Sequence, residues 1–167
     1  MNRKISTLIT VMMMTLVTMT TVAQDQSDQA KNYFAEYLTS KSMTELIARS
    51  LPTLEECKLV FKEQDAETYF KAIEAMKSKA EADPKEENET FSDVQIDRFS
   101  TEDIEQQKGN YAGGMDQILE KLQLGVVFYK VSLLREKDAE RGLAFKYWVH
   151  INGRWVFFPK PYHVFEK

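Results

Sequence analysis

The feature that most constrains the fold is the dipeptide Asn152-Gly153, which lies between two runs of β-forming residues. A two-residue type I′ turn needs positive φ at both central positions, and asparagine and glycine tolerate that conformation best. The turn therefore predicts a hairpin in which Ile151 pairs with Arg154 and His150 pairs with Trp155, and in which this register continues along both strands away from the turn.

Side chains alternate between the two faces of such a hairpin, and here both faces are apolar. One face carries Phe145, Tyr147, Val149, Ile151, Val156 and Phe158. The other face, called the aromatic face below, carries Trp148, His150, Trp155 and Phe157. Each apolar face must be shielded from water, so the aromatic face must pack against another layer of this chain or a second copy of it, or must line a ligand pocket. Because amphipathic aromatic side chains are frequent at binding surfaces, we take the aromatic face as the candidate ligand or partner surface.

The first half of the chain is typical of helices, because all six glycines lie at or after Gly109. Apolar residues at helical spacing predict helices over about 28–39, 43–50, 54–62 and 66–82. Capping-box patterns begin at Ser42 and at Thr53, and Asp65 is the expected N-cap of the longest helix. Cys57 shares an apolar stripe with Phe61, which predicts a buried thiol rather than a catalytic one.

The second half is typical of strands. The expected strands cover about 91–99, 124–134, 141–151 and 154–161, with a short helix over 115–122. The predicted fold class is therefore α+β, with N-terminal helices packed on a curved C-terminal antiparallel sheet of three to five strands, cone-like or cystatin-like. Residues 24–167 are expected to form a single domain.

Residues 1–23 have the features of a cleavable signal peptide. Arg3 and Lys4 precede a short apolar run over 8–17, and Ala23 ends a stretch of small residues that a signal peptidase would accept. The apolar run is too short to span a bilayer, so no membrane anchor is expected after cleavage. The sequence thus predicts an exported protein, periplasmic or secreted.

Charge and motif content exclude several classes of function. The formal net charge is −4 and no basic stripe is present, so nucleic-acid binding is not expected. The two histidines, His150 and His163, do not fall in any metal-binding spacing, and no glycine-rich phosphate loop is present. No metal or cofactor is predicted.

Residues 147–157 read as an aromatic strand, an Asn-Gly turn and a tryptophan-bearing strand. In this respect, and in its order of helices and strands, the chain resembles the nuclear transport factor 2-like superfamily, which includes SnoaL-like and ketosteroid-isomerase-like proteins. The resemblance implies a curved sheet around an apolar pocket. Ketosteroid-isomerase-like members use a pocket carboxylate as base and a tyrosine or protonated acid as hydrogen-bond donor. Asp97, Tyr129 and His150, each on an expected strand, are the candidates for such chemistry.

The favoured function is an exported, non-catalytic binding or interaction domain whose aromatic face takes a small apolar ligand or a protein partner. Two alternatives remain open. One is a small pocket enzyme of ketosteroid-isomerase-like type that uses Asp97, Tyr129 or His150. The other is a structural homodimer in which a second copy covers the aromatic face.

Overall fold

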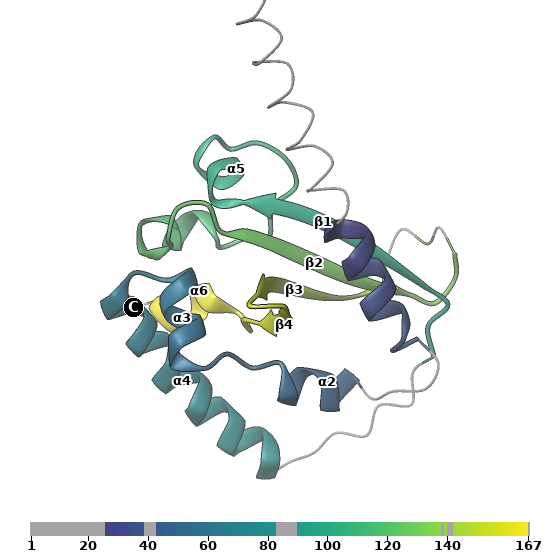
Figure 1. The fold of residues 1–167 in the computed structure, drawn as a ribbon, viewed down its shortest axis with the longest axis horizontal. Helices are drawn as coiled ribbons and strands as arrows, with labels where there is room; N and C mark the ends of the chain where they lie inside the picture. Colours follow the sequence, from purple (N-terminus) through teal and green to yellow (C-terminus); the bar gives the residue numbers. More distant parts are fainter. Residues whose placement is uncertain (1–25, 39–42, 83–89, 138, 140–141, 167) are drawn as a thin grey trace, which may run out of the picture.

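The computed structural model describes residues 26–38, 43–82, 90–137, 139 and 142–166 (Figure 1). The expected signal peptide and the Ser42 cap lie outside these residues. The described part of the chain has an α+β fold, as predicted, in which helices precede an antiparallel sheet. No helix in this part has the length and apolar content needed to span a membrane.

The sheet is a four-stranded antiparallel meander in the order β1-β2-β3-β4. Its strands are β1 (Asp93–Ser100), β2 (Val127–Leu134), β3 (Leu143–Ile151) and β4 (Arg154–Phe157). Only β3 and β4 are joined by a tight two-residue turn, whereas residues 101–126, with two short helices, connect β1 to β2.

The hairpin between β3 and β4 has the predicted register. Ile151 pairs with Arg154, and the pairing continues to Trp148 opposite Phe157. Asn152 and Gly153 have φ of 50° and 80°, as a type I′ turn requires.

One expected position on this hairpin is wrong. Phe145 was placed beside Tyr147 on the same face, but Phe145 packs with the aromatic face, 6.3 Å from Phe157 between ring centroids. The cause is a bulge in β3, where the pairing with β2 shifts and Tyr147 has a φ of 73°. A bulge inserts one residue into a strand, so side chains on its two sides exchange faces.

The helices of the first half match the predicted pattern in number and differ at their ends. Residues 26–35 are helical, and they are followed by α2 (Met43–Arg49), α3 (Leu54–Val60) and α4 (Glu63–Ala82). The capping box at Thr53 is confirmed, because Thr53 Oγ1 accepts from the Glu56 N–H at 3.2 Å and Glu56 Oε2 accepts from the Thr53 N–H at 2.8 Å.

Asp65 is not the N-cap of α4, which begins at Glu63. The Lys62 carbonyl already accepts from the Ala66 N–H at 2.9 Å, so the helix begins three residues earlier than expected. The Asp65 carboxylate instead lies 3.4 Å from Lys121 Nζ.

Three short helices follow in the second half: α5 (Thr101–Glu105), the 3₁₀ helix η1 (Asp116–Lys121) and α6 (Pro161–Phe165). The predicted last strand, which runs to about residue 161, is too long, and α6 is a helix that the sequence pattern does not predict. Pro161 is compatible with the first turn of a helix, where its missing N–H is not needed. The strand therefore ends at Phe157 and a helix follows.

Two apolar clusters lie on opposite faces of the sheet. One joins α3, α4, η1 and α6 to the face of the hairpin that bears Val149 and Val156. The other joins residues 30–38 and α2 to the aromatic face. The sheet is thus the central layer between two sets of helices (Figure 1). Cys57 is fully buried in the first cluster, as predicted.

Candidate functional site

The aromatic face is covered by the chain's own N-terminal elements. Trp148 is 0% exposed and Trp155 is 6% exposed. The Phe34 ring lies 4.7 Å from the Trp148 ring and 5.6 Å from the Trp155 ring, between centroids. Phe157 is also buried in this cluster. The cover that the sequence analysis required for these three side chains is therefore supplied by another layer of the same chain.

The fourth residue of the aromatic face, His150, is only partly buried. Its ring lies 4.8 Å from that of Trp155, which lies edge-on to Tyr129 at 5.0 Å. His150 marks the edge of the covered region. Beyond it the face opens into a pocket.

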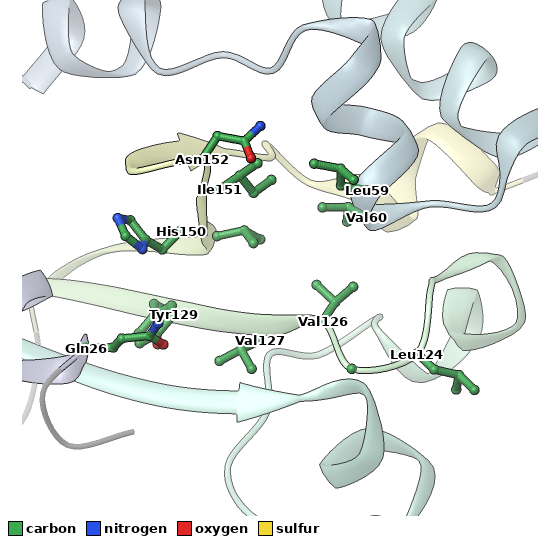
Figure 2. A pocket seen from close by; sticks show the side chains of 12 residues that line it. Gln26, Leu59, Val60, Leu124, Val126, Val127, Tyr129, His150, Ile151 and Asn152 are labelled. Carbon is green, nitrogen blue, oxygen red and sulfur yellow. The ribbon is translucent and has the colours of Figure 1, made fainter. Parts of the chain in front are cut away.

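The pocket has a volume of about 400 Å³ and lies between the start of β2 and the end of β3 (Figure 2). Tyr129 and His150 line it, together with Gln26 from the first helical segment. Its aliphatic lining consists of Leu59, Val60, Leu124, Val126, Val127, Val149 and Ile151. Gly125 and Asn152 complete it.

The pocket exists because β2 and β3 separate. β2 pairs with β1 along its whole length, from Val127 to Leu134. Its pairing with β3 runs only from Leu133 opposite Leu143 to Tyr129 opposite Trp148. Past that pair the two strands no longer form a ladder, although each keeps its partner on the other side.

The end of β3 is held away from β2 by contacts of the β3–β4 hairpin with α3 and with the segment before it. Arg154 Nε lies 2.8 Å from Glu56 Oε1, and its guanidinium also donates to the Leu51 carbonyl at 3.0 Å. The Phe157 N–H donates to the Ser50 carbonyl at 2.7 Å. A charge-assisted bond to a buried carboxylate is among the stronger side-chain contacts, so the hairpin is fixed on this side.

The start of β2 is fixed by different contacts. The Thr101 N–H donates to the Val126 carbonyl at 3.0 Å, and the Gly125 N–H donates to Glu102 Oε1 at 2.9 Å. Gln123 donates through its backbone to the Val60 carbonyl at 2.9 Å and through its side chain to the Phe61 carbonyl at 3.2 Å. Both walls of the pocket are therefore held by contacts within the chain, among them contacts to α3, so the pocket is formed without a ligand.

The lining of the pocket combines seven aliphatic side chains with the polar side chains of Gln26, Tyr129, His150 and Asn152. None of its described lining residues is Asp, Glu, Lys or Arg, in a chain of which 29% of residues are charged. Leu59 and Leu124 are 52% and 83% exposed, and both lie on its rim. Exposed leucines beside an aliphatic pocket are typical of a surface that binds apolar groups.

The three candidate catalytic residues do not converge. Asp97 pairs opposite Lys130 and its carboxylate lies 2.8 Å from Lys130 Nζ, on the sheet face opposite to that of the neighbouring pair Arg98 and Tyr129. The Tyr129 hydroxyl donates to Gln26 Oε1 at 2.9 Å. Burial raises the pKa of Tyr129, and the Arg98 charge only partly opposes this. Tyr129 and His150 line the pocket, and Asp97 does not.

The Cys57 thiol is not a nucleophile in this environment. Burial, with the Glu56 charge as a smaller cause, raises the pKa of Cys57 to about 12. The thiol therefore stays protonated at neutral pH, whereas nucleophilic cysteines need the thiolate. Among the described residues, no group of three or more His, Cys, Asp or Glu is placed to hold a metal ion.

Of the pocket lining, only Tyr129, His150 and the apolar residues of the hairpin are singled out by the sequence pattern. The sequence signal for a further lining residue is Leu124 followed by Gly125, an apolar residue beside a glycine that is typical of a turn. The separation of β2 from β3 has no local signal, because contacts far apart in the sequence produce it.

Comparisons with known proteins give no match to this chain, whether among protein-family models, curated proteins or solved structures.

Proposed function

We propose that this protein is an exported, non-catalytic binding module that takes a small, uncharged apolar ligand in the pocket between β2 and β3. The observation that carries the proposal is the preformed pocket, with aliphatic walls and no charged residue in its described lining. Its volume of about 400 Å³ lies within the roughly 300–1,000 Å³ range of small-molecule sites.

The aromatic face contributes to this function as a rigid support. Trp155 lies between His150 and Tyr129, which both line the pocket. Packed aromatic neighbours restrict the rotamers of the side chains that meet the ligand, so less conformational freedom is lost on binding. The pocket thus lies at the edge of the aromatic face.

Export to a periplasm or to the outside of the cell is part of the proposal. It rests on the signal-peptide pattern of residues 1–23, with cleavage before Gln24. A relationship to the nuclear transport factor 2-like superfamily stays a prediction that rests on the hairpin sequence. Catalysis of ketosteroid-isomerase type is not proposed, because Asp97 does not line the pocket that Tyr129 and His150 share.

A fluorescence titration with the uncharged probe N-phenyl-1-naphthylamine tests the proposed function. The purified chain is expected to bind one probe per molecule. Leu124→Asp places a carboxylate on the pocket rim at a position that is 83% exposed, so the fold is expected to be unaffected. We expect at least tenfold weaker binding, which corresponds to about 1.4 kcal/mol.

Met76→Asp is the matched control for this titration. Met76 is also an exposed large apolar residue, at 41%, but it lies on α4 and does not line the pocket. Its replacement should leave probe affinity unchanged. Absence of saturable binding, or equal loss in both variants, would refute the proposed function.

A further inference from the structure

The main chain at the point where β2 and β3 separate indicates the class of ligand. Hydrogen bonds in an antiparallel ladder alternate, so each residue directs its N–H and C=O to one neighbouring strand only. The hydrogen bonds of β2 with β1, and of β3 with β4, show which residues are already engaged on those sides. The alternate residues of each strand direct their main-chain groups toward the pocket.

On β2, the even-numbered residues face β1. The Thr101 N–H donates to the Val126 carbonyl at 3.0 Å, and the register continues from Ser100 opposite Val127. By alternation, Val127 and Tyr129 direct their main-chain groups toward β3.

On β3, the odd-numbered residues of the hairpin face β4. The Phe158 N–H donates to the Tyr147 carbonyl at 3.0 Å, and Ile151 pairs with Arg154 at the turn. Trp148 and His150 therefore direct their main-chain groups toward β2.

Trp148 pairs with Tyr129, and this is the last pair of the ladder between β3 and β2. The next pair in the same alternation is His150 with Val127, and these two residues line opposite walls of the pocket (Figure 2). Their N–H and C=O groups thus point across the pocket toward each other without forming a pair. Both residues are only partly buried, so these groups are accessible to a ligand. An extended peptide that supplied donors and acceptors here would continue the ladder on each strand.

From this geometry we infer that the ligand is a short extended peptide with uncharged aliphatic side chains, inserted between β2 and β3. This rests on the proposed function, because it names the ligand of the same pocket. A peptide presents an N–H and a C=O on alternate sides, so one extended segment can pair with Val127 on one edge and with His150 on the other. This is the main-chain mode of peptide recognition by strand addition.

The lining fits the side chains of such a peptide. In a strand, successive side chains point to opposite faces of the sheet. The pocket offers aliphatic contacts on both: Val60 and Val149 belong to the cluster on one face, and Val127 packs against the cluster on the other. The absence of charge from the described lining selects against Asp, Glu, Lys and Arg in the peptide.

The test compares two blocked tripeptides, acetyl-Val-Ala-Val-amide and the same peptide methylated at its central amide nitrogen, by isothermal titration of the full chain. Methylation adds apolar surface while it removes one N–H donor. Main-chain pairing predicts at least tenfold weaker binding of the methylated peptide. Apolar contact alone predicts equal or tighter binding, and that result would overturn the inference.

Amide hydrogen exchange, followed by NMR, provides the second readout and needs no variant. The N–H groups of Val127 and His150 should exchange at least tenfold more slowly when the unmethylated peptide is bound. The N–H of Val149 already faces β4, so its exchange should not change and it serves as the internal control. Unchanged exchange at both Val127 and His150 with peptide bound would overturn the inference.

The two proposals fail differently. If N-phenyl-1-naphthylamine binds in the pocket and neither peptide binds, the peptide inference is wrong while the apolar-ligand proposal stands. If neither the probe nor the peptides bind, both are wrong.

Discussion

At the scale of single residues, Gly114 shows how closely the C-terminal helix is packed. Gly114 has a φ of 87°, and a Cβ atom added there would lie 2.6 Å from Cγ of Tyr162. Tyr162 lies on α6 and also packs edge-on against Tyr147, whose hydroxyl donates to the Gly113 carbonyl at 3.0 Å. The ring of Tyr162 thus occupies the space that any side chain at residue 114 would need.

Gly114→Ala is expected to lower the free energy of unfolding by about 2–5 kcal/mol. Left-handed backbone costs a non-glycine residue roughly 1–2 kcal/mol, and overpacking adds roughly 1–3 kcal/mol. Gly109→Ala is the control, since Gly109 also has positive φ, at 74°, but nothing lies within 4 Å of its added Cβ. Urea denaturation of both variants gives the two values. An equal loss in the two would show that the contact with Tyr162 costs nothing.

The burial of Cys57 predicts a chemical reactivity. Because burial raises the pKa of Cys57 to about 12, the folded chain holds almost no thiolate at pH 8. We expect iodoacetamide to react at least a hundredfold more slowly with the folded chain than with the chain in urea, as followed by mass spectrometry.

The same pKa shift gives a pH dependence of stability. The raised value means that the unfolded chain loses this proton at lower pH than the folded chain does. The contribution of Cys57 to stability is therefore complete below about pH 9 and decreases as the pH rises toward 12. Rapid alkylation of the folded chain at pH 8 would contradict the raised pKa of Cys57.

At the scale of elements, local patterns predicted the β3–β4 hairpin and long-range contacts determined the pocket. The Asn152-Gly153 turn fixes pairing over a few residues, so its register could be predicted from the sequence. The bulge at Tyr147 and the separation of β2 from β3 depend on tertiary contacts, among them Arg154 with Glu56. Such contacts join residues far apart in the chain, and periodicity carries no information about them.

Arg154→Ala tests the contact that holds the hairpin away from β2. The change leaves Glu56, whose side chain is 9% exposed, without its ionic partner. We expect the free energy of unfolding to fall by about 1–3 kcal/mol, since a largely buried carboxylate that keeps only its bonds from Thr53 is costly without a counter-charge. Binding of N-phenyl-1-naphthylamine should weaken as well, because the wall formed by His150 and Ile151 loses its anchor.

Lys146→Ala is the control for Arg154→Ala. Lys146 also lies on β3, is exposed, and does not line the pocket. Thermal unfolding and probe titration of the two variants make the comparison. If Arg154→Ala leaves both stability and probe affinity unchanged, the contact between Arg154 and Glu56 has no part in shaping the pocket.

At the scale of the whole molecule, the sheet is the middle of three layers, and the layer that covers the aromatic face comes from the N-terminal elements. The apolar pattern of the hairpin predicts that both of its faces are covered. The pattern does not indicate which part of the chain, or which partner, covers the aromatic face, because only the tertiary fold brings Phe34 to Trp148.

Phe34→Ala is expected to lower the free energy of unfolding by about 3–5 kcal/mol, the usual cost of truncating a buried phenylalanine. Phe34 is 0% exposed and contacts both tryptophans of the aromatic face. Tyr33→Ala is the matched control, because the neighbouring Tyr33 is only partly buried and its loss should cost less. Guanidinium denaturation followed by tryptophan fluorescence measures both. Equal stability of the two variants would contradict this role of residues 26–38.

The binding proposal is tested most directly by locating a bound apolar probe. Intermolecular NOEs should be recorded between N-phenyl-1-naphthylamine and the methyl groups of the full chain. We predict NOEs to Val127, Val149 and Ile151, which line the pocket between β2 and β3. NOEs found only to methyl groups outside that pocket, or no bound probe at all, would contradict the account.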